Sequence, residues 1–253
     1  MEPRSFDFIN GEVLLIDKPL TWTSFSVVNK LRWLIKHKIK QKIKVGHAGT
    51  LDPLATGLLI ICTGKFTKRI EEFQAREKEY TGTISIGATT PSADLEKEID
   101  QHFPTEHITD EMIREATKNF LGVIDQSPPL FSAINVDGKR AYKLARKGDE
   151  TVLPTRKVEI REFEIANIER KKIEPVHSAA ILDSARTSSI INVDFRVVCS
   201  KGTYIRALAR DFGLALNSGA HLSALRRTAI GEFRVSDAMT VEDFESIVTG
   251  SDW

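Results

Sequence analysis

The chain has 253 residues, of which 41% are hydrophobic, and a formal net charge of +1 at pH 7. This composition can supply a substantial core, and the near-neutral charge excludes a general nucleic-acid binder that acts through bulk basicity. The N-terminus has no apolar stretch of the signal-peptide kind, and the densest apolar run, Leu58 to Cys62, is far too short to span a bilayer. We therefore expect a cytoplasmic protein without a membrane span.

The two cysteines of the chain are Cys62 and Cys199, and both lie in apolar, strand-like segments. That context favours reduced thiols in the core over a disulfide framework or a zinc site. We expect no bound metal.

The first third of the chain predicts a strand, a helix and a second strand. Glu12 to Ile16 is the first strand, and Ser24 is expected to cap a helix with an apolar face. The segment from Lys30 to Lys44 then carries seven basic residues and no acidic one. Such a segment can attract phosphate, although a solvated charge run beside a helix is the simpler explanation when the segment is considered alone.

A glycine-rich loop, Gly46 to Gly57, follows the basic segment and leads into the apolar strand Leu58 to Cys62. Its glycines allow tight or left-handed backbone geometry, and Pro53 stiffens the chain directly after Asp52. The loop could be an ordinary surface turn, or it could hold the Asp52 carboxylate in a fixed pose at a cleft. A P-loop is excluded because Gly64-Lys65 is followed by phenylalanine instead of serine or threonine.

The rest of the chain predicts strands and helices in uneven alternation. The expected strands are Glu79 to Ile86, Val158 to Ile168 and Ile191 to Cys199, with a polar, irregular excursion from Glu169 to Ser189. The expected helices are Asp110 to Phe120 behind a Thr109 cap, Arg140 to Lys147, one that starts after a Thr203 cap, and a last one opened by a Thr240–Asp243 capping box. This order indicates an α+β protein with a mixed, mainly antiparallel sheet flanked by helices.

The candidate chemical groups are a carboxylate, an arginine, a tyrosine and a histidine, each near a glycine turn, and no cofactor motif accompanies them. Hydrolysis, isomerisation and simple RNA binding all remain open on these residues alone. Glycoside hydrolysis by two carboxylates is disfavoured, because no second glycine-framed acid stands near Asp52. A lone carboxylate suits covalent or glycal-type chemistry at a sugar carbon.

The loop from Gly46 to Gly57 closely resembles the first motif of the TruB-type tRNA pseudouridine synthases. Further segments resemble later motifs of that family in the same order: Lys78-Glu79-Tyr80, Gln126 to Ala133, Cys199 to Arg206 and Leu225-Arg226-Arg227. The resemblance runs from about Val13 to Phe233. It implies the pseudouridine synthase fold and conversion of uridine to pseudouridine in the T-loop of tRNA, at nucleotide 55, without metal or cofactor.

The resemblance also implies roles for catalytic residues. Asp52 is the essential carboxylate, which either attacks C1′ of the target ribose or removes a proton from C2′ to form a glycal. Arg206 pairs with Asp52 and keeps it ionised and oriented. Tyr80 stacks on the uracil and assists removal of the proton at C5.

Further residues are implied to bind the substrate. His47 fills the space that the flipped nucleotide leaves, and Tyr204 and Leu225 line the uracil pocket. Lys78 and Asp94 complete the expected substrate-binding set. Independently of the resemblance, we expect the basic segment to lie beside the phosphate backbone of the T-arm through Lys38, Lys40 and Lys42.

The expected domain organisation is a catalytic domain over residues 1–235 and a short C-terminal tail or helix over residues 236–253, without a full RNA-binding domain of the PUA-like kind. We expect a monomer whose partner is the T-arm stem-loop of tRNA. Two alternatives differ in the role of Asp52: an RNA-binding or tRNA-folding protein in which catalysis is secondary, and a glycosidic hydrolase that releases free uracil.

Overall fold

The computed structural model describes residues 6–129, 135–136, 139–140, 154–172 and 189–250. The chain forms two compact units, unit 1 from Met1–Tyr80 with Leu225–Trp253 and unit 2 from Thr81–Ala224. It leaves unit 1 within strand β4 (Lys78–Ile86) and returns within strand β12 (Ala220–Ile230). Each unit is therefore built from segments that are distant in sequence.

The sheet of unit 1 places the glycine loop at the start of a central strand. Strand β3 (Ala55–Thr63) pairs antiparallel with β1 (Val13–Lys18) and parallel with the final part of β12, where Leu225 lies opposite Ala55. Strand β2 (Val45–His47) also pairs antiparallel with β3. The chain between β2 and β3 contains Asp52, so both ends of its loop are fixed to the same strand.

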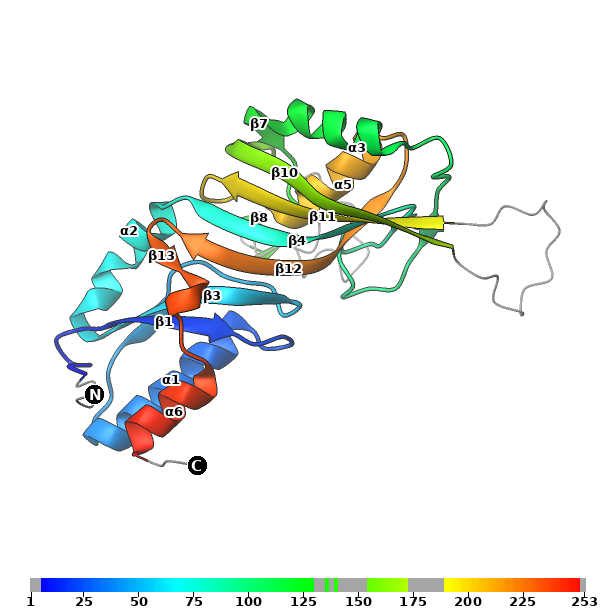
Figure 1. Ribbon diagram of the computed structural model, residues 1–253. Coiled ribbons are helices and arrows are strands. Elements are labelled where there is room, and N and C mark those ends of the chain that lie inside the picture. The colour runs from blue at the N-terminus through cyan, green and yellow to red at the C-terminus, as the bar shows by residue number, and fades with distance from the viewer. Residues whose placement is uncertain (1–5, 130–134, 137–138, 141–153, 173–188, 251–253) are drawn as a thin grey trace. The chain divides into compact units, whose positions relative to one another are not determined.

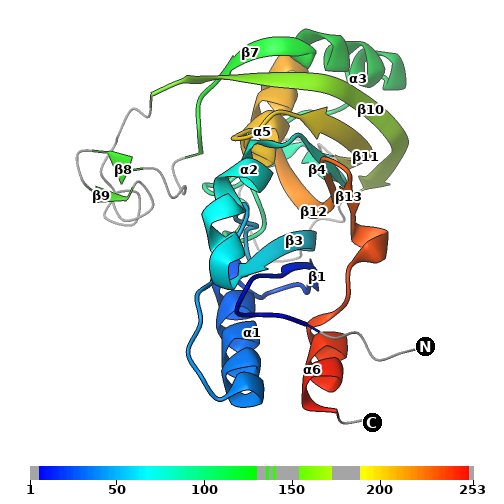
Figure 2. The same ribbon diagram turned by 90° about the vertical axis from the view of Figure 1, so that its left-hand side faces the viewer.

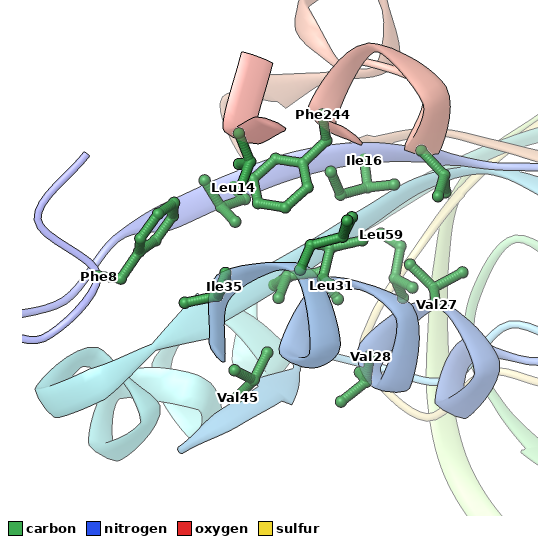
Figure 3. Close-up of a cluster of buried hydrophobic side chains, with 14 residues drawn as sticks. Phe8, Leu14, Ile16, Val27, Val28, Leu31, Ile35, Val45, Leu59 and Phe244 are labelled. Atoms are coloured by element: carbon green, nitrogen blue, oxygen red, sulfur yellow. The ribbon is translucent and has the colours of Figure 1, made fainter. Parts of the chain in front are cut away.

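Two helices cover one face of this sheet. Helix α1 (Ser24–Ile39) and helix α6 (Val241–Thr249) lie side by side against β1, as both views show (Figures 1 and 2). Figure 3 shows their apolar side chains converging with those of the strands, among them Leu31 of α1, Leu14 of β1 and Phe244 of α6. Each of these three side chains is at most 1% exposed, so the cluster anchors the helix that precedes the glycine loop.

Unit 1 also contains four short elements in its described residues. They are the 3₁₀ helix η1 (Gly64–Arg69), helix α2 (Ile70–Ala75), strand β13 (Phe233–Arg234) and the 3₁₀ turn η3 (Val235–Asp237).

Unit 2 contains a second group of strands in the order β12–β4–β11–β10–β7. Strand β10 (Arg156–Lys172) pairs antiparallel with both β11 (Ser189–Cys199) and β7 (Gly122–Gln126). Two short hairpins, β5–β6 (Ala88–Thr89 and Gln101–His102) and β8–β9 (Asn135–Val136 and Lys139–Arg140), lie outside this group. Among the described residues of unit 2, the helical elements are α3 (Asp110–Ala116), the 3₁₀ helix η2 (Thr117–Phe120) and α5 (Ile205–Ala215).

A phenylalanine cluster joins helix α5 to the strands of unit 2. The ring of Phe212 lies 5.3 Å from that of Phe163 on β10 and 5.8 Å from that of Phe120 in η2. Phe163 also contacts the ring of Phe195 on β11. Helix α5 begins directly after the turn that follows β11, so this packing fixes the position of the residues around Tyr204.

The predicted α+β class with a mixed, mainly antiparallel sheet is confirmed, as are the Thr109 cap and the Thr240–Asp243 capping box. Two predicted caps are wrong. Thr23 instead of Ser24 caps α1, because the Ser24 hydroxyl is engaged with the glycine loop. Tyr204 stands at the N-cap position of α5, because the Thr203 hydroxyl donates to the Ser200 carbonyl and closes the preceding turn.

The predicted irregular excursion begins too early. Strand β10 continues to Lys172, since its polar residues remain paired with β11 as far as the Lys172–Ser189 pair. The helix predicted over Arg140 to Lys147 lies outside the described residues. None of the helices in the described part of the chain is long and apolar enough to cross a membrane.

Candidate active site

Asp52 lies in a short loop whose ends are held by backbone hydrogen bonds. The Ala48 amide donates to the Ile60 carbonyl at 2.9 Å, and the Ala55 amide donates to the Asp52 carbonyl at 3.0 Å. Gly57, at the start of β3, has a φ of +102°, and a Cβ there would lie 2.3 Å from the Arg227 carbonyl oxygen. Glycine is therefore required where β12 approaches the loop.

Buried side chains fix the main chain on both sides of Asp52. The Ser24 hydroxyl accepts from the Leu51 amide at 2.8 Å and donates to the Leu51 carbonyl at 3.1 Å. The Lys18 ammonium donates to the Pro53 carbonyl at 3.3 Å, and the Arg227 guanidinium donates to the Gly49 carbonyl at 3.1 Å. Asp52 is half-buried, and its two neighbours are anchored to a helix and a strand.

Lys18 and Arg227 also place two buried cations near Asp52. Lys18 is fully buried and donates to the carbonyls of Pro19 and Trp22 as well as to that of Pro53. Burial lowers the pKa of Lys18 to about 8, and the positive charge of Arg227 acts in the same direction, whereas the negative charge of Asp52 opposes the shift. Lys18 therefore interacts electrostatically with both Asp52 and Arg227 at the glycine loop.

His47 lies at the end of β2, next to this loop. Burial is the largest cause that lowers the pKa of its imidazole, and the charge of Arg227 adds to it. The ring is therefore neutral at pH 7. Its Nδ1 atom is buried and has no hydrogen-bond partner among the described residues. A neutral, half-buried ring at this place can pack against a nucleotide without a charge that must be desolvated.

The other predicted residues of unit 1 lie on β4 and β12. Leu225 is half-buried and pairs with Ala55, three residues after Asp52, so the structure brings Leu225 to the end of the glycine loop. Tyr80 is buried on β4. Lys78 is also buried, and its ammonium donates at 2.5 Å to the carbonyls of Gln74 and Arg76 at the end of α2. Its predicted role in substrate binding remains a prediction.

In unit 2 the structure brings Arg206 and Asp94 together. Arg206 lies in the first turn of α5, and its Nε is 3.5 Å from a carboxylate oxygen of Asp94. Its Nη1 donates to the Ser92 carbonyl at 3.1 Å. Both charged side chains are nearly fully buried, so removal of either one would leave an uncompensated charge in the interior. The predicted pairing of Arg206 with Asp52 of unit 1 remains a prediction.

The backbone of Tyr204 is held by the side chain of Gln126. The Gln126 side chain accepts from the Tyr204 amide at 2.8 Å and donates to the Tyr204 carbonyl at 3.1 Å. The guanidinium of Arg156 lies over the Tyr204 ring, 4.0 Å from its centroid. Arg156 precedes the predicted strand and belongs to none of the recognised motifs, so no local sequence signal identifies it.

The basic residues predicted to contact the RNA phosphate backbone lie at the end of α1 and just beyond it. Lys38 is in the last turn, Lys40 ends the helix with a left-handed conformation (φ 57°), and Lys42 follows in the connection to β2. All three are exposed, and none forms an ion pair with another described residue. Their charges are available to an external anion.

Comparison with known proteins supports the resemblance found in the sequence. The model of the TruB family pseudouridylate synthase N-terminal domain matches residues 36–205, and that of the tRNA pseudouridylate synthase B C-terminal domain matches residues 206–251. The tRNA pseudouridine synthase B of Flavobacterium johnsoniae is 56% identical over 94% of this chain and 96% of its own length. That of Phocaeicola vulgatus is 57% identical over 94% of this chain and 93% of its own.

Solved structures with the same fold include two from larger assemblies. A chain from the crystal structure of a Cbf5-Nop10-Gar1 complex matches with a TM-score of 0.62 and 28% identity, covering 94% of this chain and 54% of its own. A chain from an H/ACA RNP bound to a substrate RNA that contains 2′-deoxyuridine matches with a TM-score of 0.62 and 26% identity, covering 96% and 56% respectively. The present chain thus spans about half the length of these solved chains.

The match to the family models places the chain among the pseudouridine synthases. Because the family models match nearly the whole chain and close relatives exceed 50% identity, the chain belongs to the TruB family of pseudouridylate synthases.

Proposed function

We propose that this protein isomerises uridine to pseudouridine in tRNA, at position 55 of the T-loop. The observation that carries the proposal is the single carboxylate, Asp52, on a loop whose main chain is anchored on both sides. Membership of the TruB family and the name of the close relatives, tRNA pseudouridine synthase B, support tRNA as the substrate. Because tRNA is modified in the cytoplasm of bacteria, we expect the protein to act there. We also expect it to act as a monomer.

The reaction keeps all the atoms of uridine. The N1–C1′ glycosidic bond breaks, the uracil rotates, and a C5–C1′ bond forms, after which C5 loses its proton and N1 carries one. Asp52 either attacks C1′ or takes the C2′ proton to give a glycal, and its anchored position suits both routes. The target nucleotide must leave the stacked loop before Asp52 can reach it.

The other site residues have supporting roles in this proposal. Arg206 orients Asp52, and Asp94 holds Arg206 through the buried ion pair. Tyr80 stacks on the uracil, Tyr204 and Leu225 line its pocket, and the neutral His47 occupies the space left by the flipped nucleotide. Lys78, which is buried at the start of β4, also belongs to the proposed substrate-binding set.

The basic segment supports binding of the stem. Lys38, Lys40 and Lys42 are exposed and unpaired within the described residues, and we propose that they lie along the phosphate backbone of the T-arm.

The proposal is tested with an unmodified T-arm hairpin, in which pseudouridine is mapped by carbodiimide-dependent stops of reverse transcription. We expect one stop, at the T-loop uridine, with the wild-type protein and none with Asp52→Asn. If both proteins bind the hairpin and full-length tRNA but produce no stop, the protein is an RNA-binding or tRNA-folding protein. Release of free uracil would instead show a hydrolase.

A further inference from the structure

Arg156 lies beside Tyr204, and the roles described above do not include it. It is the first residue of β10 and pairs with Gln126 of β7, the residue whose side chain holds the Tyr204 backbone. Its guanidinium lies 4.0 Å from the centroid of the Tyr204 ring. A Cβ at Gly202 would lie 3.5 Å from its Nη1, so the guanidinium also lies next to the glycine turn between β11 and α5.

The charge of Arg156 is not neutralised within the described part of the molecule. Its guanidinium donates to none of the described carboxylate or carbonyl oxygens, and its Nε is buried without a hydrogen-bond partner. Nearby cations are different: Lys157 pairs with Asp125, Arg161 with Glu159, Arg206 with Asp94, and Arg210 with Asp211. A buried donor without an acceptor is costly in a folded protein, so this one points to an external acceptor.

The surroundings of the Arg156 guanidinium favour a phosphate oxygen as its hydrogen-bond acceptor. Stacking on an aromatic ring fixes the plane of a guanidinium and leaves its N–H edges for paired hydrogen bonds, the geometry that phosphate accepts best. Lys201, exposed in the same turn as Gly202, adds a second positive charge on this side of unit 2. The Gln126 side chain holds the Tyr204 backbone at both its N–H and its C=O, so the platform under Arg156 is rigid.

We propose that Arg156 binds a phosphodiester group of the RNA substrate, close to the nucleotide that contacts Tyr204. This inference rests on the proposed function, because it takes RNA as the substrate and Tyr204 as a wall of the uracil pocket. Arg156 then acts in binding and not in the chemical step. The stacked arrangement also makes the site specific for arginine, since lysine lacks the planar fork.

The test uses Arg156→Gln with Arg161→Gln as a matched control, because Arg161 is on the same strand, is exposed and changes the net charge equally. We expect Arg156→Gln to weaken binding of the T-arm hairpin about tenfold and to reduce the slope of log affinity against log salt by about one, with kcat nearly unchanged. Arg156→Lys is expected to recover only part of the affinity. Arg161→Gln is expected to bind like the wild type.

A panel of hairpins with one neutral methylphosphonate each then locates the contact. One linkage is expected to weaken wild-type binding about tenfold and to cause no further loss in Arg156→Gln. Equal binding by the two glutamine variants, or additive losses at every linkage, would overturn the inference while leaving the proposed function intact if the wild type still forms pseudouridine. Failure of the wild type to bind the hairpin at all would overturn both.

Discussion

At the scale of single residues, the position of Asp52, the proposed catalytic carboxylate, depends on side chains that bond the main chain around it. Ser24 bonds both the amide and the carbonyl of Leu51, the residue before Asp52, and Lys18 and Arg227 donate to the carbonyls of Pro53 and Gly49. These contacts restrict the loop to one backbone conformation. A carboxylate that must reach a single ribose carbon benefits from that restriction, because small displacements are costly in catalysis.

We expect Ser24→Ala to lower kcat about tenfold and to leave KM for tRNA within about twofold of the wild type, because the loop moves while the RNA-binding surface does not. Steady-state kinetics measure both values. Ser26→Ala is the matched control, since Ser26 is exposed on the same helix and bonds only near the Thr23 cap. Equal kcat values for the two variants would show that Ser24 does not position Asp52.

Lys18 links stability to pH. Because burial lowers its pKa from 10.5 to about 8, the unfolded chain holds a proton between these pH values that the folded protein has released. The free energy of unfolding contributed by this group therefore rises with pH from about 8 to about 10.5. We expect the denaturation midpoint of the wild type to rise relative to that of Lys18→Met as the pH increases from 8 to about 10. If the difference between the two denaturation midpoints stays constant over this pH range, the pKa of Lys18 is not lowered.

Sequence alone predicted which residue types carry the chemistry better than it predicted their partners. Asp52 was found because a carboxylate in a glycine-rich loop before an apolar strand is a local pattern. The Ser24 contact to Leu51 joins residues 27 positions apart, and the Arg156–Tyr204 stack joins the start of β10 to the N-cap of α5, which are distant in sequence. The hydrophobic periodicity of a sequence does not reveal contacts between distant residues, so neither contact could be predicted.

At the scale of elements, α1 links two parts of unit 1 that serve the same substrate in our proposal. Its first residue, Ser24, contacts the Asp52 loop, and its last turn carries Lys38 and leads to Lys40. The apolar face of the helix packs against β1 and α6 (Figure 3). Lys38 and Lys40 are exposed. Element boundaries were less predictable: β10 is longer than expected because pairing with β11 outweighs its polar composition.

We expect replacement of Lys38, Lys40 and Lys42 by glutamine to raise KM for tRNA and to flatten its dependence on salt, because fewer phosphates are neutralised. KM measured over a series of salt concentrations gives the slope. A control variant with glutamine at Lys97, Lys118 and Lys172, which are exposed in unit 2, removes the same charge. If both triple variants show the wild-type slope, the basic segment does not contact the RNA.

At the scale of the whole molecule, the residues with proposed roles belong to both units. Asp52, His47, Tyr80 and Leu225 belong to unit 1, and Tyr204 and the Arg206–Asp94 pair belong to unit 2. The chain leaves unit 1 after Tyr80 and returns to it at Leu225. The fold class followed from the order of predicted strands and helices, whereas the division into these units depends on contacts between distant segments that the sequence pattern does not contain.

In our proposal, Asp52 drives isomerisation of one uridine in tRNA. The most direct test is to measure release of tritium from tRNA transcripts labelled at C5 of uridine, because formation of the C5–C1′ bond displaces that hydrogen. We predict that the wild type releases one equivalent per tRNA and that Asp52→Asn binds the same tRNA but releases none. Release by Asp52→Asn at the wild-type rate, or none by a wild-type protein that binds tRNA, would contradict the account.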